Sequence, residues 1–126
     1  MPITQPFDEH TQRYEDWFDE HDYEYTSELE AVRSLLPSRG VGVEIGIGSG
    51  QFAVPLGVEY GIDPSDEMMK VAREKDDEIH LVKGVAEHLP FRETVFDYAL
   101  IVTTICFVDD IPTTLAEARR VLDDGS

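Results

Sequence analysis

Short apolar segments alternate with amphipathic ones through most of the chain, which predicts alternating strands and helices. β-branched residues at every second position predict a short buried strand over 41–45. Two further strands are expected over 58–62 and 79–82, and the apolar run 98–108 predicts a parallel strand covered on both faces. This alternation indicates an α/β domain built on a parallel sheet.

The N-terminal third is predicted to be helical. Residues 1–12 are expected to be loose, and the pattern over 13–36 indicates a helix in two pieces, the second from about 28 to 36 and ended by Pro37. Tyr14, Trp17 and Phe18 fall on one apolar stripe, as in a helix that packs against a core.

Three more helices are predicted between and after the strands. A short one over 51–56 is expected to be broken by Pro55, and one ending near Lys75 is expected to be capped by Ser65. The last runs from 112 to 122, with Gly125 as its stop. Its apolar face is predicted to comprise Leu115, Ala118, Val121 and Leu122.

The first strand runs into three glycines at alternate positions, Gly46, Gly48 and Gly50. Without Cβ atoms, such a run can turn sharply and let a ligand approach the backbone N–H groups. A strand, a glycine turn and a helix N-terminus together indicate a nucleotide-type pocket at the carboxyl end of a parallel strand. The alternative interpretation is a plain tight turn.

An acid at the end of the second strand favours the pocket. Asp63 follows Glu44 by 19 positions (63 − 44), and a carboxylate at the tip of the neighbouring strand can accept both hydroxyls of a ribose. The nicotinamide fingerprint G-x-G-x-x-G would need its third glycine at position 51, where Gln51 stands.

The spacing E-x-G-x-G-x-G, from Glu44 to Gly50, resembles the first motif of the class I S-adenosylmethionine-dependent methyltransferases. The segment 84–91 resembles the family's G-D-A-E-x-L-P-F, with Val85 in place of the first acid. Phe96-Asp97 and the E-x-x-R-V-L sequence at 117–122 extend the similarity to the whole of residues 41–126, closest to the small-molecule branch called type 11.

The resemblance implies S-adenosylmethionine as cofactor and a set of residues around it. Glu44 would orient the ammonium group, the three glycines would admit the methionine end, and Asp63 would hold the ribose. The full set of cofactor-binding residues that it implies is Tyr14, Trp17, Glu44, Gly46, Gly48, Gly50, Asp63, Pro64, Met68, Ala86, Glu87 and Thr103.

Other interpretations of these side chains remain open. Tyr14, Trp17 and Met68 also suit core packing, and Glu87 suits a solvated loop. No catalytic residue is assigned, because methyl transfer from a sulfonium needs positioning more than an acid or a base. The N/D-P-P-Y tetrapeptide of adenine-N6 and glutamine methyltransferases is absent, and Thr103 stands in its region.

The family sheet has the strand order 3-2-1-4-5-7-6, and this chain carries four of those strands. We therefore expect a Rossmann-like sheet truncated to about four strands in the order 3-2-1-4, with residues 1–38 as a helical segment over the pocket. Residues 39–126 would form the cofactor-binding core without the last three strands. The fourth strand would then be an apolar edge, which predicts a homodimer through that edge.

Composition bounds the partners. The formal charge of −17, from 27 acids and 10 bases, argues against nucleic acid or an anionic membrane as a partner. The sequence has no apolar run of 18 residues and no signal-peptide pattern at its start. A single cysteine, Cys106, excludes a disulfide framework and favours the cytoplasm, and the four histidines have no ligand-like spacing, so no metal is assigned.

Three of the ten bases are lysines, so the acidic surface suits either adaptation to high salt or an ordinary soluble acidic protein. The expected function is S-adenosylmethionine-dependent methylation of an unidentified small molecule. A non-enzymatic cofactor-binding or dimerising fragment is the alternative, and a nicotinamide oxidoreductase is disfavoured by Gln51.

Overall fold

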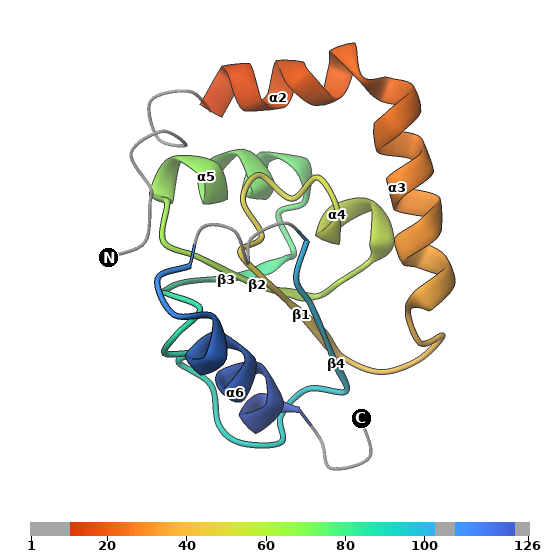
Figure 1. Ribbon diagram of the computed structural model, residues 1–126. Coiled ribbons are helices and arrows are strands. Elements are labelled where there is room, and N and C mark those ends of the chain that lie inside the picture. The colour runs from red at the N-terminus through yellow and green to blue at the C-terminus, as the bar shows by residue number, and fades with distance from the viewer. Residues whose placement is uncertain (1–10, 103–107, 123–126) are drawn as a thin grey trace.

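The centre of the molecule is a four-stranded parallel sheet in the order β3-β2-β1-β4 (Figure 1). It is seen in a computed structural model that describes residues 11–102 and 108–122. The strands are β1 (Gly42–Ile45), β2 (Tyr60–Asp63), β3 (His80–Lys83) and β4 (Tyr98–Leu100). The fold class and the strand order predicted from the sequence are both confirmed.

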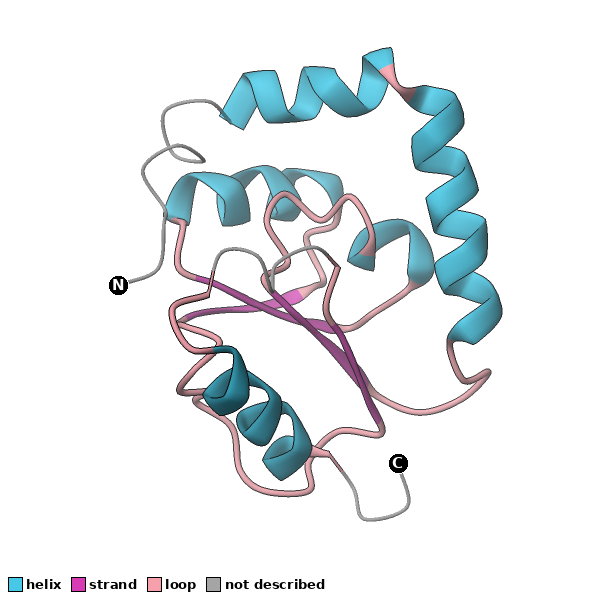
Figure 2. Cartoon of the chain, in the orientation of Figure 1, coloured by secondary structure: helices cyan, strands magenta, loops and turns pink. Residues whose placement is uncertain are grey.

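Helices lie on both faces of this sheet, with α6 alone on one face and the others on the opposite one (Figure 2). No helix of the described residues is long and apolar enough to cross a bilayer. The helices are α2 (Thr11–Glu20), α3 (Asp22–Leu35), α4 (Ala53–Leu56), α5 (Asp66–Lys75) and α6 (Ile111–Val121).

Each face of the sheet has its own apolar cluster. Between the sheet and α6, the cluster is built on Val43, Ile45, Phe96 and Val121, which are fully buried. The cluster on the opposite face joins Phe18 of α2 to residues around α4 and to the face of the sheet that is turned away from α6. Each such large side chain contributes about 1.5–3 kcal/mol by its burial, so both faces fix the position of the strand ends.

The helix boundaries differ from expectation at two places. The break in the N-terminal helix lies at His21, not near residue 28, because His21 leaves the helical conformation (φ −115°, ψ 42°). Pro55 does not break α4, since it lies within the first turn, where its missing N–H has no partner to lose. Gly57 ends that helix in the left-handed conformation.

The buried face of α6 contains Ala118 and Val121, as predicted, but Thr114 lies on it in place of Leu115. Thr114, Ala118 and Val121 are buried, whereas Leu115 is 54% exposed. The Thr114 hydroxyl donates to the carbonyl oxygen of Asp110 at 2.9 Å, so this polar side chain is satisfied in the interior. The predicted stop at Gly125 lies outside the described residues.

β4 is shorter than the apolar run that predicted it. Its three residues pair with Gly42, Val43 and Glu44 of β1, and the pairing with β4 ends there, one residue before β1 itself ends at Ile45. Tyr98 and Ala99 are half-buried and pack against the clusters on opposite faces of the sheet, so β4 is contacted from both faces although it is not fully buried. Thr103 and Cys106 lie outside the described residues.

Candidate cofactor site

Three parallel strands end at one edge of the sheet and bring the candidate residues together there. The glycine loop follows β1, Asp63 ends β2, and the segment starting at Gly84 follows β3. The Gly84 N–H donates to the Asp63 carbonyl oxygen at 3.2 Å, so the second and third of these loops are in direct contact. This is the edge at which open α/β sheets bind their ligands.

The glycine loop needs the freedom of its glycines. Gly46, Gly48 and Gly50 all have positive φ values of 78°, 57° and 81°, a region that disfavours other residues. A Cβ on Gly50 would lie 2.9 Å from Val54 Cγ2 and 3.3 Å from Ala72 Cβ. The loop is therefore a tight turn pressed against α4 and α5.

Asp63 is bonded to the glycine loop. One carboxylate oxygen accepts from the Gly48 N–H at 2.9 Å, and the other accepts from the Ser65 N–H at 2.8 Å. The side chain is 9% exposed. Since each carboxylate oxygen can accept more than one hydrogen bond, Asp63 can brace the loop and still receive a ligand hydroxyl.

Glu44 lies beneath the loop, with only 2% of its surface exposed. Its Oε1 accepts from the N–H of Ala53, the first residue of α4, at 3.1 Å. Burial raises the pKa of Glu44 well above its usual value, the hydrogen bond from Ala53 opposes this, and the negative charge of Asp63 adds to it. Glu44 thus joins β1 to the start of α4, and its contact with an ammonium group stays a prediction.

The hydroxyl of Ser49, between two of the glycines, is fully buried. It has no hydrogen-bond partner among the described residues. Buried polar groups in folded proteins nearly always have one. The glycine loop therefore holds a polar group that a ligand lying against it could satisfy.

The residues expected around adenine lie on α5 and on the segment after β3. Met68 is 1% exposed, Ala86 is buried, and Pro64 is half-buried. Glu87 is half-buried, and its Oε2 accepts from the backbone N–H groups of Asp109 and Asp110 at 2.7 and 3.2 Å. The loop-acid interpretation of Glu87 thus gives way to a contact with the chain just before α6.

The remaining candidates are not brought to these loops by any described contact. Trp17 is 44% exposed, and its ring stacks on His21 of the same helical segment with centroids 4.1 Å apart. Tyr14 lies in α2, but its side chain and the whole of Thr103 fall outside the described residues. Their roles at the pocket stay predictions.

A link from the N-terminal helices to the loop was missed by the sequence analysis. The Tyr25 hydroxyl donates to the Gln51 carbonyl oxygen, and the Gln51 side-chain amide donates to Glu15 Oε1 at 2.9 Å. Lys75 Nζ lies 2.9 Å from the other Glu15 oxygen. These contacts join residues 26 to 60 positions apart, so no local pattern signals them.

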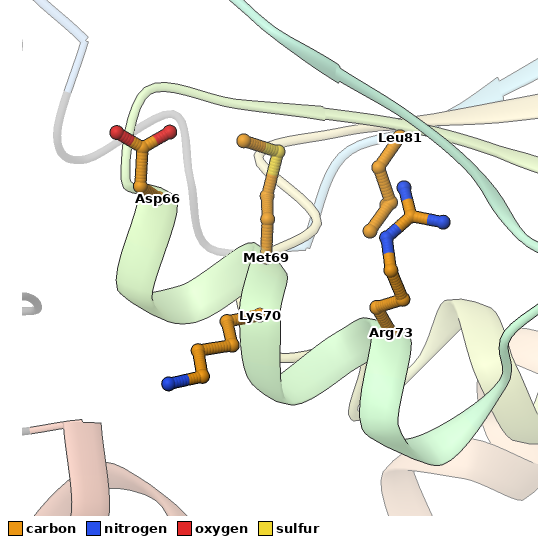
Figure 3. A pocket seen from close by; sticks show the side chains of 5 residues that line it. All are labelled: Asp66, Met69, Lys70, Arg73 and Leu81. Carbon is orange, nitrogen blue, oxygen red and sulfur yellow. The ribbon is translucent and has the colours of Figure 1, made fainter.

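An open surface hollow lies elsewhere, between α5 and β3 (Figure 3). The Arg73 side chain extends beside Leu81, whereas Lys70 points away from it. The lining residues are Asp66, Met69, Lys70, Arg73 and Leu81, and none is a predicted site residue. The candidate cofactor site therefore stays at the strand ends.

Comparison with known proteins agrees with this geometry. Residues 43–126 match the methyltransferase domain family. A crystal structure from Thermotoga maritima, described as an S-adenosylmethionine-dependent methyltransferase and possible histamine N-methyltransferase, superposes with a TM-score of 0.88 at 50% identity, over 93% of this chain and 55% of that one.

Two curated relatives extend the comparison. An uncharacterised protein of Methanocaldococcus jannaschii is 40% identical, over 94% of this chain and 57% of its own length. The malonyl-[acyl-carrier protein] O-methyltransferase of Geobacter sulfurreducens is 33% identical, over 77% of this chain and 42% of its own length. The chain spans roughly half the length of the proteins it matches.

Proposed function

Because the chain belongs to the class I S-adenosylmethionine-dependent methyltransferases, we propose that it binds S-adenosylmethionine at the carboxyl ends of β1, β2 and β3 and methylates a small-molecule acceptor. The observation that carries the proposal is the bond between Asp63 and the Gly48 N–H. It holds a carboxylate, suited to ribose hydroxyls, beside a loop suited to the methionine end.

The residues present fit this cofactor. The left-handed glycines let the loop turn tightly at the end of β1, the Ser49 hydroxyl has no partner among the described residues, and the carboxylate of Asp63 has acceptor positions beyond the two N–H bonds named above. Pro64, Met68, Ala86 and Glu87 would border the adenine, and Glu44 would attract the ammonium group from below. Tyr14, Trp17 and Thr103 are proposed to complete the pocket.

The chemistry demands little of the protein beyond placement. When bound, S-adenosylmethionine supplies a methyl group on a sulfonium, and the electron pair of the breaking C–S bond stays on sulfur. Asp63 would hold the ribose and the glycine loop the methionine end, so that the sulfonium between them is fixed and the acceptor approaches in line. Residues 1–38 would cover the cofactor pocket of residues 39–126 and exclude water from it. The contact of Tyr25 with Gln51 supports this role.

We propose a small amine as the acceptor. The net charge of −17 raises the local concentration of cations around the molecule. The Thermotoga maritima structure is described as a possible histamine N-methyltransferase, and the Geobacter sulfurreducens relative methylates an oxygen. Methyl transfer to a panel that pairs small amines with small carboxylic acids separates these two acceptor classes.

Calorimetric titration of S-adenosylmethionine into the 126-residue chain, in low salt and in molar KCl, tests the site. Micromolar binding that is weakened at least roughly tenfold when Asp63 is replaced by Ala supports the proposal. A chain with a folded far-UV spectrum that binds in neither condition overturns it. NADH as a second titrant tests the nicotinamide alternative.

A second candidate is a cofactor-binding module without turnover. It is favoured by one observation, that the chain spans 55% of its Thermotoga maritima neighbour. S-adenosylmethionine binding with no methyl transfer to any acceptor of the panel supports the module. Product formation by this same chain supports the enzyme.

We further propose a cytoplasmic homodimer that binds neither nucleic acid nor membrane. Among the described strands, β4 pairs with β1 alone, and we propose that its other edge pairs with a second copy of the chain. Sedimentation velocity at several concentrations tests the dimer. A monomer mass that does not change with concentration contradicts it.

A further inference from the structure

Two sequence motifs about 30 residues apart meet in the structure. Glu117 and Arg120 of α6 both reach the segment Leu89–Phe91, which follows β3. Arg120 donates from one terminal nitrogen to the Phe91 carbonyl oxygen and from the other to that of Leu89, each at 2.9 Å. Glu117 Oε1 accepts from the Leu89 N–H at 2.8 Å.

The two side chains also hold each other. Arg120 Nε lies 2.6 Å from Glu117 Oε2, and a terminal nitrogen of Arg120 lies 3.0 Å from Glu117 Oε1. Hydrogen bonds to Arg120 lower the pKa of Glu117, and those to Glu117 raise the pKa of Arg120, so both are charged across the physiological range. A planar guanidinium can serve two carbonyls and a carboxylate at once, whereas a lysine ammonium is a single point.

The clamped segment continues directly into the proposed adenine-binding residues. Leu89 is 3% exposed and packs in the same core cluster as Ala86. Val85 and His88 close the turn between them with a backbone bridge, and Gly84 donates to the Asp63 carbonyl oxygen. The loop over 84–91 is thus fixed to Asp63 at one end and to Arg120 at the other.

We propose that Glu117 and Arg120 are positioning residues for the adenine side of the cofactor site, acting through the loop over 84–91. The inference rests on the proposed function, since it assigns that loop to the adenine. Neither side chain would touch the ligand. Their role is to hold the backbone of Val85, Ala86 and Glu87 in the position where it can contact the adenine.

The test compares Arg120→Gln and Arg120→Lys with Arg119→Gln, a matched control. Arg119 is exposed on the same helix, so its replacement removes the same charge without touching the loop. Hydrogen exchange of the Leu89 amide reports on the clamp in the ligand-free chain. Titration with S-adenosylhomocysteine and S-inosylhomocysteine, which lacks the adenine amino group, reports on the base.

We expect Leu89 to exchange at least tenfold faster in Arg120→Gln than in wild type, and S-adenosylhomocysteine to bind roughly tenfold more weakly, the cost of about one hydrogen bond. In Arg120→Gln, the ratio of the affinities for S-adenosylhomocysteine and S-inosylhomocysteine should fall from its wild-type value towards one, because only the contacts to the base are displaced. Arg120→Lys should lie between the two, and Arg119→Gln should match wild type.

Three outcomes overturn the inference, and they are distinguishable. An unchanged Leu89 exchange rate in Arg120→Gln denies the clamp itself. Faster exchange with an unchanged ratio of the two affinities denies its role at the base. A folded wild-type chain that binds neither ligand overturns the proposed function, and this role with it. If Arg120→Gln does not fold, Arg120→Lys gives the same comparison.

Discussion

Asp63 combines a structural role with the binding role that we propose for it. Both of its oxygens accept backbone N–H groups, from Gly48 and from Ser65. The first of these belongs to the glycine loop and the second is the N-cap of α5. A single carboxylate therefore connects the loop after β1 to the start of the helix after β2.

Replacement of Asp63 by Ala should weaken S-adenosylmethionine binding roughly 10- to 150-fold, because a charge-assisted hydrogen bond contributes about 1.5–3 kcal/mol. The free energy of unfolding should also fall by about 1–3 kcal/mol for each buried N–H left without a partner. Calorimetric titration below the melting transition gives the first value, and urea unfolding gives the second.

Asp66→Ala is the control for this change. It removes an acid three positions away that is 71% exposed and pairs with Lys83, so the dissociation constant should stay within about twofold, since exposed ion pairs contribute little. If both variants bind equally well, Asp63 is not the ribose ligand.

Glu44 predicts a pH dependence of stability with a definite sign. Burial raises its pKa in the folded state, so folding favours the protonated form. Its contribution is fully present below the unfolded value of about 4.3 and is lost as the pH rises through the raised folded pKa. Glu44→Gln keeps an oxygen for the Ala53 N–H and removes this titration.

The free energy of unfolding of Glu44→Gln should therefore gain on wild type as the pH rises from acid to neutral. Guanidinium unfolding of both chains at a series of pH values measures this difference in free energy. Asp110 and Glu117, whose pKa values are lowered, are present in both chains, so their contributions cancel in the difference. Parallel pH profiles for the two chains would contradict the assignment of a raised pKa to Glu44.

At the scale of elements, the glycine loop and α4 behave as one unit. Glu44 bonds the first residue of α4, and Gly50 lies against Val54 and Ala72. α4 has only four residues, too few to be stable alone, so it depends on these contacts. The loop conformation and the helix should form and melt together.

Two alanine substitutions separate packing from backbone strain at this unit. Gly57→Ala adds a Cβ at a positive φ with nothing within 4 Å, so it should cost about 1–2 kcal/mol of stability from the left-handed backbone alone. Gly50→Ala carries the same strain and a 2.9 Å contact with Val54, which should add about 1–3 kcal/mol.

Urea unfolding of both variants measures the difference. Equal losses would show that the loop moves away from Val54 and Ala72 at little cost, and that it is not pressed against α5.

At the scale of the whole molecule, charge is the dominant feature. Twenty-seven acids stand against ten bases on 126 residues. The mutual repulsion of exposed acids opposes the compact state, and dissolved salt weakens it. Of the ten basic side chains, Lys75, Lys83 and Arg120 already form ion pairs with single acids among the described residues.

Stability should therefore rise between low salt and molar KCl, as the screening length falls from about 10 Å at 0.1 M to about 3 Å at 1 M. A gain of about 1 kcal/mol would raise the melting temperature by roughly 4 °C or more for a domain of this size. Thermal unfolding in KCl measures the shift, and sucrose of equal osmolality, which does not screen charge, is the control. Melting temperatures that do not change with KCl would indicate an ordinary acidic protein.

Much of the fold could be predicted because its signals are local. The alternation of β-branched residues marks β1, and three glycines at alternate positions mark the turn that follows it. Ser65 marks the start of α5. Such features depend on a few neighbouring residues and survive any tertiary arrangement. The strand order came from the resemblance to a family, and the structure confirms it.

The errors have a common physical origin in packing. Leu115 continues the helical repeat of Ala118 and Val121 as well as Thr114 does, and only the position of α6 on the sheet buries Thr114 and exposes Leu115. Likewise, the apolar run after Tyr98 suits a long strand, but in the described part of that run β1 pairs only with Tyr98, Ala99 and Leu100.

The sequence by itself determined the type of domain, the glycine loop and the identity of the acids beside it. Only the tertiary structure decided which groups those acids contact in other elements: Gly48 for Asp63, Ala53 for Glu44, and the chain before α6 for Glu87. The reason is physical. The partner of a side chain in another element depends on how the elements pack together. The periodicity within one element carries no information about that packing.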